Sequence, residues 1–211
     1  MKIGLISDIH GDMAGLESAL AILARENVDH ILCAGDLVER GTEGDAVVRL
    51  IREREIPCVQ GNHDEFAQDN QRWLRDNSDL NHPHVRGQLL TKETLAYLQQ
   101  LPASLRFEWA GLRILLIHGT PKSNLEFLFP HSPVARFKMI AKEAETDIII
   151  CGHTHEPMQV KHLGVRFFNP GSVYNGEQRG SHTCAMLSLP NCAFAVFSLD
   201  NGMPIDAPIE R

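Results

Sequence analysis

The chain has 211 residues, of which 43% are hydrophobic and 22% charged, as in a globular protein with a substantial core. Its formal net charge is −7 and it has no long basic segment, which argues against a strong nucleic-acid interface but not against a small anionic substrate. No apolar segment approaches membrane-spanning length and no signal sequence is recognisable, so we expect a cytoplasmic protein without a membrane partner.

The N-terminal third alternates between short apolar segments and amphipathic ones. Apolar segments predict strands at Lys2–Ser7, His30–Gly35 and Ile56–Gln60. Between them, apolar residues at helical spacing predict one helix capped by Asp12 and another over Glu43–Glu55. This order of elements is typical of right-handed βαβ units and a largely parallel sheet.

The middle of the chain begins with a polar segment, Glu65–Gln100, whose end at Thr91–Gln100 has helical spacing. We interpret this segment as helical, cap-like decoration between core strands. Beyond it, Arg113–His118 and Asp147–Cys151 are predicted strands, separated by a predicted helix over Val134–Glu145.

The C-terminal part has the pattern of antiparallel strands at Val165–Phe168, Thr183–Leu189 and Cys192–Ser198, followed by an irregular tail after Asp200. Edge strands here could pair between chains of a homo-oligomer. We expect residues 1–211 to form a single domain that carries the helical decoration.

The cysteines are odd in number and lack the spacing of a metal-binding pair. We therefore expect buried free thiols in a reducing compartment at Cys33, Cys58, Cys151, Cys184 and Cys192.

Five short polar motifs follow predicted strands. They are Asp8-Ile9-His10, Gly35-Asp36, Gly61-Asn62-His63-Asp64, His118-Gly119 and Gly152-His153-Thr154-His155. Each alone is also typical of a turn or a helix cap. Ligands of α/β sheets gather beyond the carboxyl ends of strands, so the set predicts one shared site. Its oxygen and nitrogen ligands suit a pair of divalent transition metals, a device for hydrolysing phosphate esters.

This ordered set resembles the signature of the calcineurin-like metallophosphoesterase family, over about residues 1–175. Asn169-Pro170-Gly171-Ser172 and the predicted helix of Thr91–Pro102 resemble segments of its small bacterial and archaeal phosphodiesterase branch. The resemblance implies an α/β fold in which two mixed β-sheets pack as a sandwich flanked by helices, with a helical insertion.

The resemblance also implies a ligand set. One metal would be held by Asp8, His10 and His155, the other by Asn62, His118 and His153, with Asp36 as a bridge between them. The cofactors would be two divalent transition metal ions, with manganese expected first and iron, nickel, cobalt or zinc as alternatives. A hydroxide bridging the ions would attack phosphorus in line with the leaving oxygen.

His63 of the third motif would act as the general acid or donate a hydrogen bond to substrate, since histidine titrates in the useful range. The alternative is a fixed hydrogen bond within the loop. Two carboxylates could orient it. Glu39 stands where related protein phosphatases have Asp in a Gly-Asp-x-Val-Asp-Arg-Gly motif, and Asp64 is adjacent.

We expect the substrate to be a small phosphate ester, and two positions bear on its class. Arg40 matches an arginine that contacts phosphate in protein phosphatases, although a surface salt bridge is the alternative. Gln60 stands where those enzymes have a second arginine. We therefore expect phosphodiester hydrolysis, with a phosphoprotein or nucleotide phosphatase as the alternative.

A third hypothesis is an inert scaffold on the same fold, as in the retromer subunit related to this family, but all seven ligand positions are intact. Six histidines fall outside the signature and are expected to be structural or exposed, although His84 could contact substrate together with Arg86: His30, His82, His84, His131, His162 and His182. We interpret five phenylalanines as core or cap packing: Phe127, Phe129, Phe137, Phe167 and Phe168.

Overall fold

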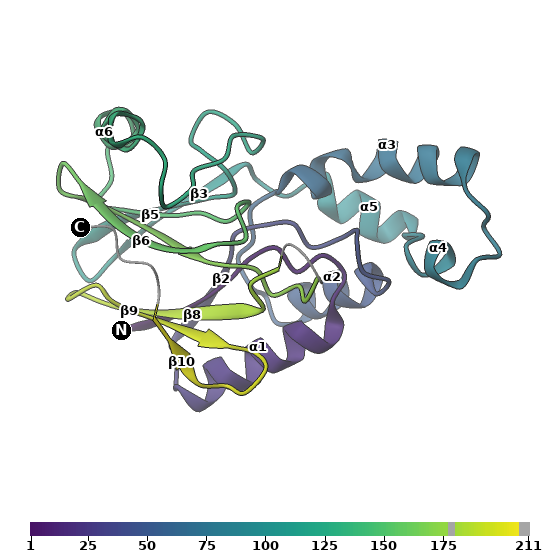
Figure 1. Ribbon diagram of the computed structural model, residues 1–211, viewed down its shortest axis with the longest axis horizontal. Coiled ribbons are helices and arrows are strands. Elements are labelled where there is room, and N and C mark those ends of the chain that lie inside the picture. The colour runs from purple at the N-terminus through teal and green to yellow at the C-terminus, as the bar shows by residue number, and fades with distance from the viewer. Residues whose placement is uncertain (177–179, 207–211) are drawn as a thin grey trace.

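The computed structural model describes residues 1–176 and 180–206, which build two five-stranded sheets and flanking helices (Figure 1). The strands are β1 (Lys2–Ile6), β2 (His30–Cys33), β3 (Ser104–Trp109), β4 (Leu112–Ile117), β5 (Ile148–Ile150), β6 (Pro157–His162), β7 (Val165–Pro170), β8 (Thr183–Ser188), β9 (Ala193–Ser198) and β10 (Pro204–Ile205). The helices are α1 (Met13–Arg25), α2 (Gly44–Glu53), α3 (Asn62–Asn77), α4 (Pro83–Gly87), α5 (Lys92–Leu98) and α6 (Val134–Glu143).

Both sheets are mixed. One has the strand order β10-β9-β8-β1-β2 and the other β3-β4-β5-β7-β6. The pairs β1–β2, β4–β5 and β5–β7 are parallel, so the strands that precede the polar motifs point toward one edge of the sandwich. The predicted fold of two mixed sheets flanked by helices is confirmed.

Alternating apolar side chains build the layers of the sandwich. In β4, Ile114 and Leu116 belong to the core between the two sheets. Leu115 and Ile117 of the same strand belong to a second cluster, which contains Phe137 of α6. Helices α1 and α2 cover the outer face of the other sheet, opposite α6 (Figure 1). A shift of one residue would move each set to the wrong layer, so burial fixes the register.

The predicted helical decoration is present as α3, α4 and α5, which extend from one end of the sandwich (Figure 1). The buried Gln71 of α3 ties this region together, because its Nε2 donates to the Gln88 carbonyl and its Oε1 accepts from the Leu90 N–H, at 2.8 and 3.0 Å. Helix α3 begins at Asn62, so the third polar motif forms its first turn.

The predicted strand at Ile56–Gln60 is wrong. Only an isolated bridge joins Cys58 to Cys33 of β2. Pro57 has no N–H to donate, and the Gln60 N–H bonds to the Pro102 carbonyl at 2.8 Å, which takes the chain away from the sheet.

Several other expectations need correction. The sequence patterns did not predict β3 and β6, and β10 lies in the tail that was expected to be irregular. Residues 207–211 of that tail lie outside the described residues. Strand β7, expected to be antiparallel, is parallel to β5 and antiparallel only to β6. All five cysteines are free and buried, as predicted. None of the helices among the described residues has the length and apolar character to cross a membrane.

Candidate metal centre

The loops after β1, β2 and β5 have an unusual backbone. Several non-glycine residues there lie in the left-handed region, with φ from 50° to 71°, namely Asp8, His10, Asp36, Glu39, Arg40, His153 and His155. Such conformations cost on the order of 1–3 kcal/mol each and persist where the surrounding structure holds them, commonly at functional sites. The strained backbone directs these side chains toward a common centre.

Two glycines let the loops approach each other closely. A Cβ at Gly61 would lie 2.0 Å from Oδ1 of Asp36, and a Cβ at Gly152 would lie 1.9 Å from Oγ of Ser7. The Gly152 N–H also donates to the carbonyl of His118 at 2.8 Å. Both positions therefore require glycine for steric reasons.

Asp8 is held by one oxygen and presents the other to the centre. Its Oδ2 accepts from Oγ of Ser7 at 2.6 Å and from the His153 N–H at 3.0 Å. Its Oδ1 lies 3.1 Å from Nε2 of His155, yet no donor within residues 1–176 and 180–206 is aligned to bond it. This oxygen is therefore placed as a metal ligand would be.

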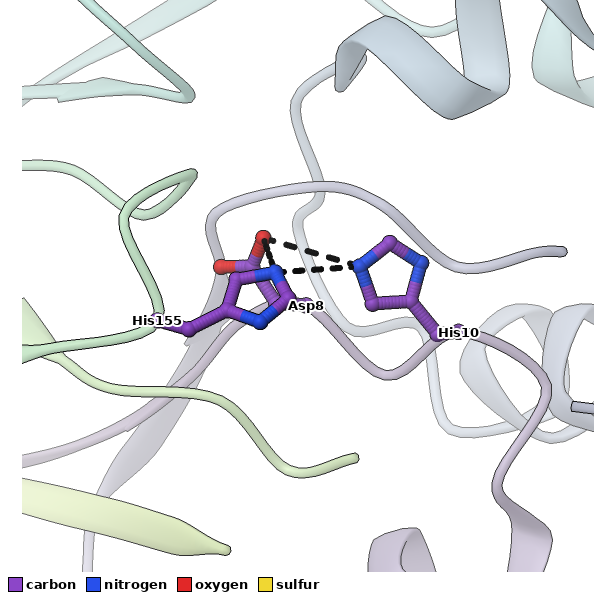
Figure 2. A group of neighbouring side chains, drawn as sticks. All are labelled: Asp8, His10 and His155. Carbon is purple, nitrogen blue, oxygen red and sulfur yellow. Dashed lines mark hydrogen bonds and ion pairs between the residues drawn. The ribbon is translucent and has the colours of Figure 1, made fainter. Parts of the chain in front are cut away.

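Asp8, His10 and His155 form the first ligand group, with ligand atoms within 4.8 Å of one another. Figure 2 shows the three side chains converging. Nε2 of His10 and Nε2 of His155 lie 3.2 Å apart. Nδ1 of His10 is 3.2 Å from the Val38 carbonyl. A proton on Nδ1 bonds this carbonyl and leaves the Nε2 lone pair directed at the centre.

Asp36, His118 and His153 form the second ligand group. Nδ1 of His118 lies 2.7 Å from the Ala34 carbonyl, which again leaves Nε2 for the centre, 3.1 Å from Oδ1 of Asn62. Nε2 of His153 is buried and has no hydrogen-bond partner among the described residues. The structure thus brings together the predicted ligands of the second metal.

Asp36 lies between the two groups. Its Oδ1 accepts from the His63 N–H at 2.9 Å. Its Oδ2 lies 3.8 Å from Nε2 of His10 and 3.3 Å from Nε2 of His118, which belong to different groups. One carboxylate oxygen therefore faces both places where the sequence predicts a cation.

The centre favours negative aspartates. Burial raises the pKa values of Asp8 and Asp36, but neighbouring imidazoles outweigh this effect and hold both below their ordinary range. For His118, burial lowers the pKa, but Asp36 outweighs it and raises the pKa to about 10. A proton on His118 thus balances the buried carboxylates, which is a role that a cation can take over.

His10 and His153 are neutral near pH 7. Burial lowers the pKa of His10 to about 3, which Asp36 and Asp8 only partly offset. Burial and the charge of His118 lower the pKa of His153 to about 4. Neutral imidazole is the form that binds metals.

The residues fit divalent transition metals. Oδ1 of Asp8 and Nε2 of His153 are buried atoms without an aligned partner among residues 1–176 and 180–206, and both belong to a ligand group. The donor set mixes carboxylate oxygen with imidazole nitrogen, which suits manganese, iron, cobalt, nickel or zinc better than magnesium or calcium.

His63 lies beside the first group and is paired with Glu39. Its Nδ1 is 2.6 Å from Oε2 of Glu39, whose Oε1 accepts from Nδ2 of Asn70 at 2.6 Å. Its ring lies 4.8 Å from that of His10. Burial lowers the pKa of His63, but Glu39 and Asp36 outweigh it and raise the pKa above its ordinary value.

Asp64 does not orient the His63 ring. Its carboxylate accepts the backbone N–H groups of Asp36, Leu37 and Gly61 at 2.8 to 3.0 Å. Burial and the charge of Asp36 raise its pKa to about 7. Asp64 thus holds the backbone around Asp36, and Glu39 is the carboxylate that contacts His63.

A cavity of about 780 Å³ opens over the centre. Arg40 lines it and forms no ion pair within the described part of the chain, which disfavours the salt-bridge alternative. Gln60 is turned away, since its Nε2 donates to the Leu98 carbonyl at 2.8 Å. Neither His84 nor Arg86 is among the described residues that line this cavity.

The sequence patterns missed several residues of the site. Ser7 and Asn70, which hold Asp8 and Glu39, gave no motif. Phe127 and Phe129 were interpreted as packing, but both line the cavity and Phe127 is 47% exposed. The alternation around the buried Leu128 is the signal that places these rings on one side.

Comparisons with known proteins agree with this geometry. A model of the calcineurin-like phosphoesterase superfamily domain matches residues 1–191. A probable metallophosphoesterase of Methanothermobacter thermautotrophicus is 28% identical over 173 residues, 82% of this chain and 77% of the relative. A phosphodiesterase of Methanocaldococcus jannaschii is 26% identical over 176 residues, 81% and 83% of the two chains. The crystal structure of a metallophosphoesterase from Sphaerobacter thermophilus has the same fold, with a TM-score of 0.69, 23% identity and coverage of 99% and 89%.

Proposed function

The chain belongs to the calcineurin-like phosphoesterase superfamily, and from this premise we propose that it hydrolyses phosphodiesters with two divalent transition metal ions. Membership makes it a metal-dependent phosphoric ester hydrolase. The observation that carries the proposal is that the group with Asp8 and the group with His118 each contribute an imidazole that faces Oδ2 of Asp36. The phosphodiesterase among its relatives supports the diester.

In this proposal Asp8, His10 and His155 would hold one cation, Asn62, His118 and His153 would hold the other, and Asp36 would serve both. Manganese is the first choice, with iron, nickel, cobalt and zinc as alternatives, because several of the ligands are imidazoles. When bound, such a pair lowers the pKa of water to supply a nucleophile at neutral pH and neutralises charge on phosphoryl oxygens.

His63 donates the proton that the leaving oxygen needs. Its raised pKa keeps more of the imidazole protonated near pH 7, and Glu39 fixes the ring by holding Nδ1. Nε2 is then the atom that carries the proton toward the substrate. Asn70 in turn fixes the Glu39 carboxylate. His63 and Glu39 thus supply acid catalysis and its orientation.

Charge around the cavity favours a diester. A diester is a monoanion, whereas a monoester is largely a dianion near pH 7. Arg40 is the sole lysine or arginine among the described residues that line the cavity, and Gln60 adds no charge. The second arginine that protein phosphatases would place at position 60 is thus absent, which disfavours a dianionic monoester.

Turnover of bis(p-nitrophenyl) phosphate tests the proposal. Protein stripped with a chelator should be inactive, regain activity with Mn²⁺ and cleave this diester faster than p-nitrophenyl phosphate. Absence of diester turnover with Mn²⁺, Fe²⁺, Co²⁺, Ni²⁺ and Zn²⁺, together with failure to bind them, would contradict it and favour the inert scaffold.

A phosphomonoesterase is the second candidate, because Arg40 lines the cavity without an ion-pair partner in the described part of the chain. In that case Arg40→Ala should reduce monoester turnover far more than diester turnover. Arg72→Ala is the matched control, since Arg72 pairs with Asp69 on the exposed face of α3.

A further inference from the structure

One wall of the cavity is aromatic. The ring of Phe127 lies 4.0 Å from that of His153 with 17° between their planes. Phe129 follows at 5.5 Å and 12°, and His131 lies 5.2 Å from Phe129 at 22°. A row of nearly parallel rings therefore leads away from a candidate metal ligand. We call Phe127 and Phe129 the aromatic wall.

The aromatic wall is fixed by the core. Leu128, between the two phenylalanines, is 1% exposed and packs in the cluster of Phe137 and Ile140. The Phe129 N–H donates to Oγ of Ser132 at 3.0 Å. Alternation then turns both aromatic rings to the opposite side, where they line the cavity. Core packing thus holds two apolar rings at the entrance to a polar centre.

The cavity is larger than a phosphate group needs. Pockets of about 300–1,000 Å³ enclose whole drug-sized ligands, and this cavity measures about 780 Å³. A ring such as Phe127, left 47% exposed beside a chemical centre, gains free energy when a ligand covers it. The remaining space therefore suits an apolar, planar group attached to the phosphate.

The aromatic wall and the proton donor, His63, lie beside different ligand groups that both include or face Asp36. His63 groups with His10 and Asp36, whereas Phe127 stacks on His153 of the other group. A diester has two substituents, and the one that leaves must lie near His63. The substituent that stays on phosphorus is then the one directed to the aromatic wall.

We propose that the aromatic wall binds a planar aromatic group on the substituent that stays on phosphorus. The substrates are accordingly phosphodiesters that carry an aryl group or a nucleobase there. This inference rests on the proposed phosphodiesterase function. Aromatic pairs prefer stacked or edge-to-face contacts, which either kind of group can make with these rings.

Three diesters with the same leaving group test the inference in the Mn²⁺-loaded protein. They are methyl p-nitrophenyl phosphate, bis(p-nitrophenyl) phosphate and thymidine 5′-(p-nitrophenyl) phosphate. In Phe129→Ala, the KM for the thymidine ester relative to the methyl ester should rise about threefold to tenfold, with little change in kcat. Phe66→Ala is the matched control, because Phe66 is 41% exposed and is not among the described residues that line the cavity over the centre.

The two wall residues separate the two kinds of aromatic group. An aryl ring attached directly through oxygen reaches Phe127, so Phe127→Ala should mainly raise the KM for the bis-aryl ester. A nucleobase lies one sugar further out and reaches Phe129. A larger effect of Phe129→Ala on the thymidine ester identifies the nucleobase, and the reverse order identifies the aryl group.

Other outcomes overturn the inference. If both alanine variants change all three substrates equally, or lose bound Mn²⁺, the rings only support His153. If the protein cleaves no diester, the proposed function is contradicted instead. Calorimetric titration with two phosphonates then tests whether the aromatic wall binds an aromatic group. Tighter binding of phenylphosphonate than of methylphosphonate, lost in Phe127→Ala, is expected. Equal affinities of the two phosphonates would refute the aromatic wall as a binding surface.

Discussion

The two ligand groups use the same kinds of residue but differ in charge and access. The first group has a carboxylate of its own, Asp8, and of its three members only His155 is among the described residues that line the cavity. The second has the neutral Asn62 in the corresponding role, and both Asn62 and His153 line the cavity. Both groups share the charge of Asp36. We infer that the first group binds its cation more tightly and that the second exchanges its cation more readily.

The largest effect is expected from Asp36→Asn, which removes the shared charge. Turnover of bis(p-nitrophenyl) phosphate should fall by more than about a hundredfold, because both cations lose an anionic ligand. Elemental analysis should find less than the full metal content of the wild-type protein. Asp69→Asn, on the exposed face of α3, is the control. Full retention of both cations in Asp36→Asn would refute the shared role.

Asp8→Asn and Asn62→Ala test whether the first group binds its cation more tightly than the second. Calorimetric titration with Mn²⁺ should show a tight and a weaker phase in the wild-type protein. Asp8→Asn should weaken the tight phase by about a hundredfold, and Asn62→Ala should weaken the other phase by about tenfold. If Asn62→Ala removes the tight phase, the second group binds its cation more tightly than the first, and the inferred order of affinities is wrong.

Much of this comparison could be predicted from the sequence, because each ligand lies in a short local motif. Asp8, Asp36 and His118 follow strands whose apolar residues are plain in the chain. The strand predicted at Ile56–Gln60 failed because Pro57 and a bond to the Pro102 carbonyl override a short apolar pattern.

What the sequence left open depends on the direction of side chains in loops. Glu39 and Asp64 were equal candidates to orient His63, and backbone bonds engage Asp64 while a left-handed turn presents Glu39. The aromatic wall was also missed, because composition does not tell which side of an irregular segment faces a cavity. These features arise from tertiary contacts.

Glu39→Gln tests the role of His63 as the acid beside the first group. A protonated His63 is the active form, so activity is lost as pH rises through its pKa, which Glu39 helps to raise. The variant lowers this pKa, and the alkaline limb of the kcat/KM profile should move to lower pH. We expect kcat to fall by about tenfold or more. Glu65→Gln is the control, and an unmoved alkaline limb would argue against the role of Glu39.

Ser7→Ala should have an effect no larger than that of Asn62→Ala. It removes one of the two hydrogen bonds that hold Oδ2 of Asp8, and the His153 N–H remains. Affinity for the tighter cation should fall by about tenfold, with the weaker phase unchanged. Ser18→Ala on α1 serves as the control. A loss of affinity confined to the weaker phase would contradict the role of Ser7 in holding Asp8 of the first group.

The central claim is that the two groups hold a pair of cations joined by Asp36. Electron paramagnetic resonance of the protein loaded with two equivalents of Mn²⁺ tests it most directly. Two ions roughly 3.5–4 Å apart should give the spectrum of an exchange-coupled pair, and Asp36→Asn should lose it. The resolved hyperfine pattern of isolated Mn²⁺ at full occupancy of the wild-type protein would contradict the account.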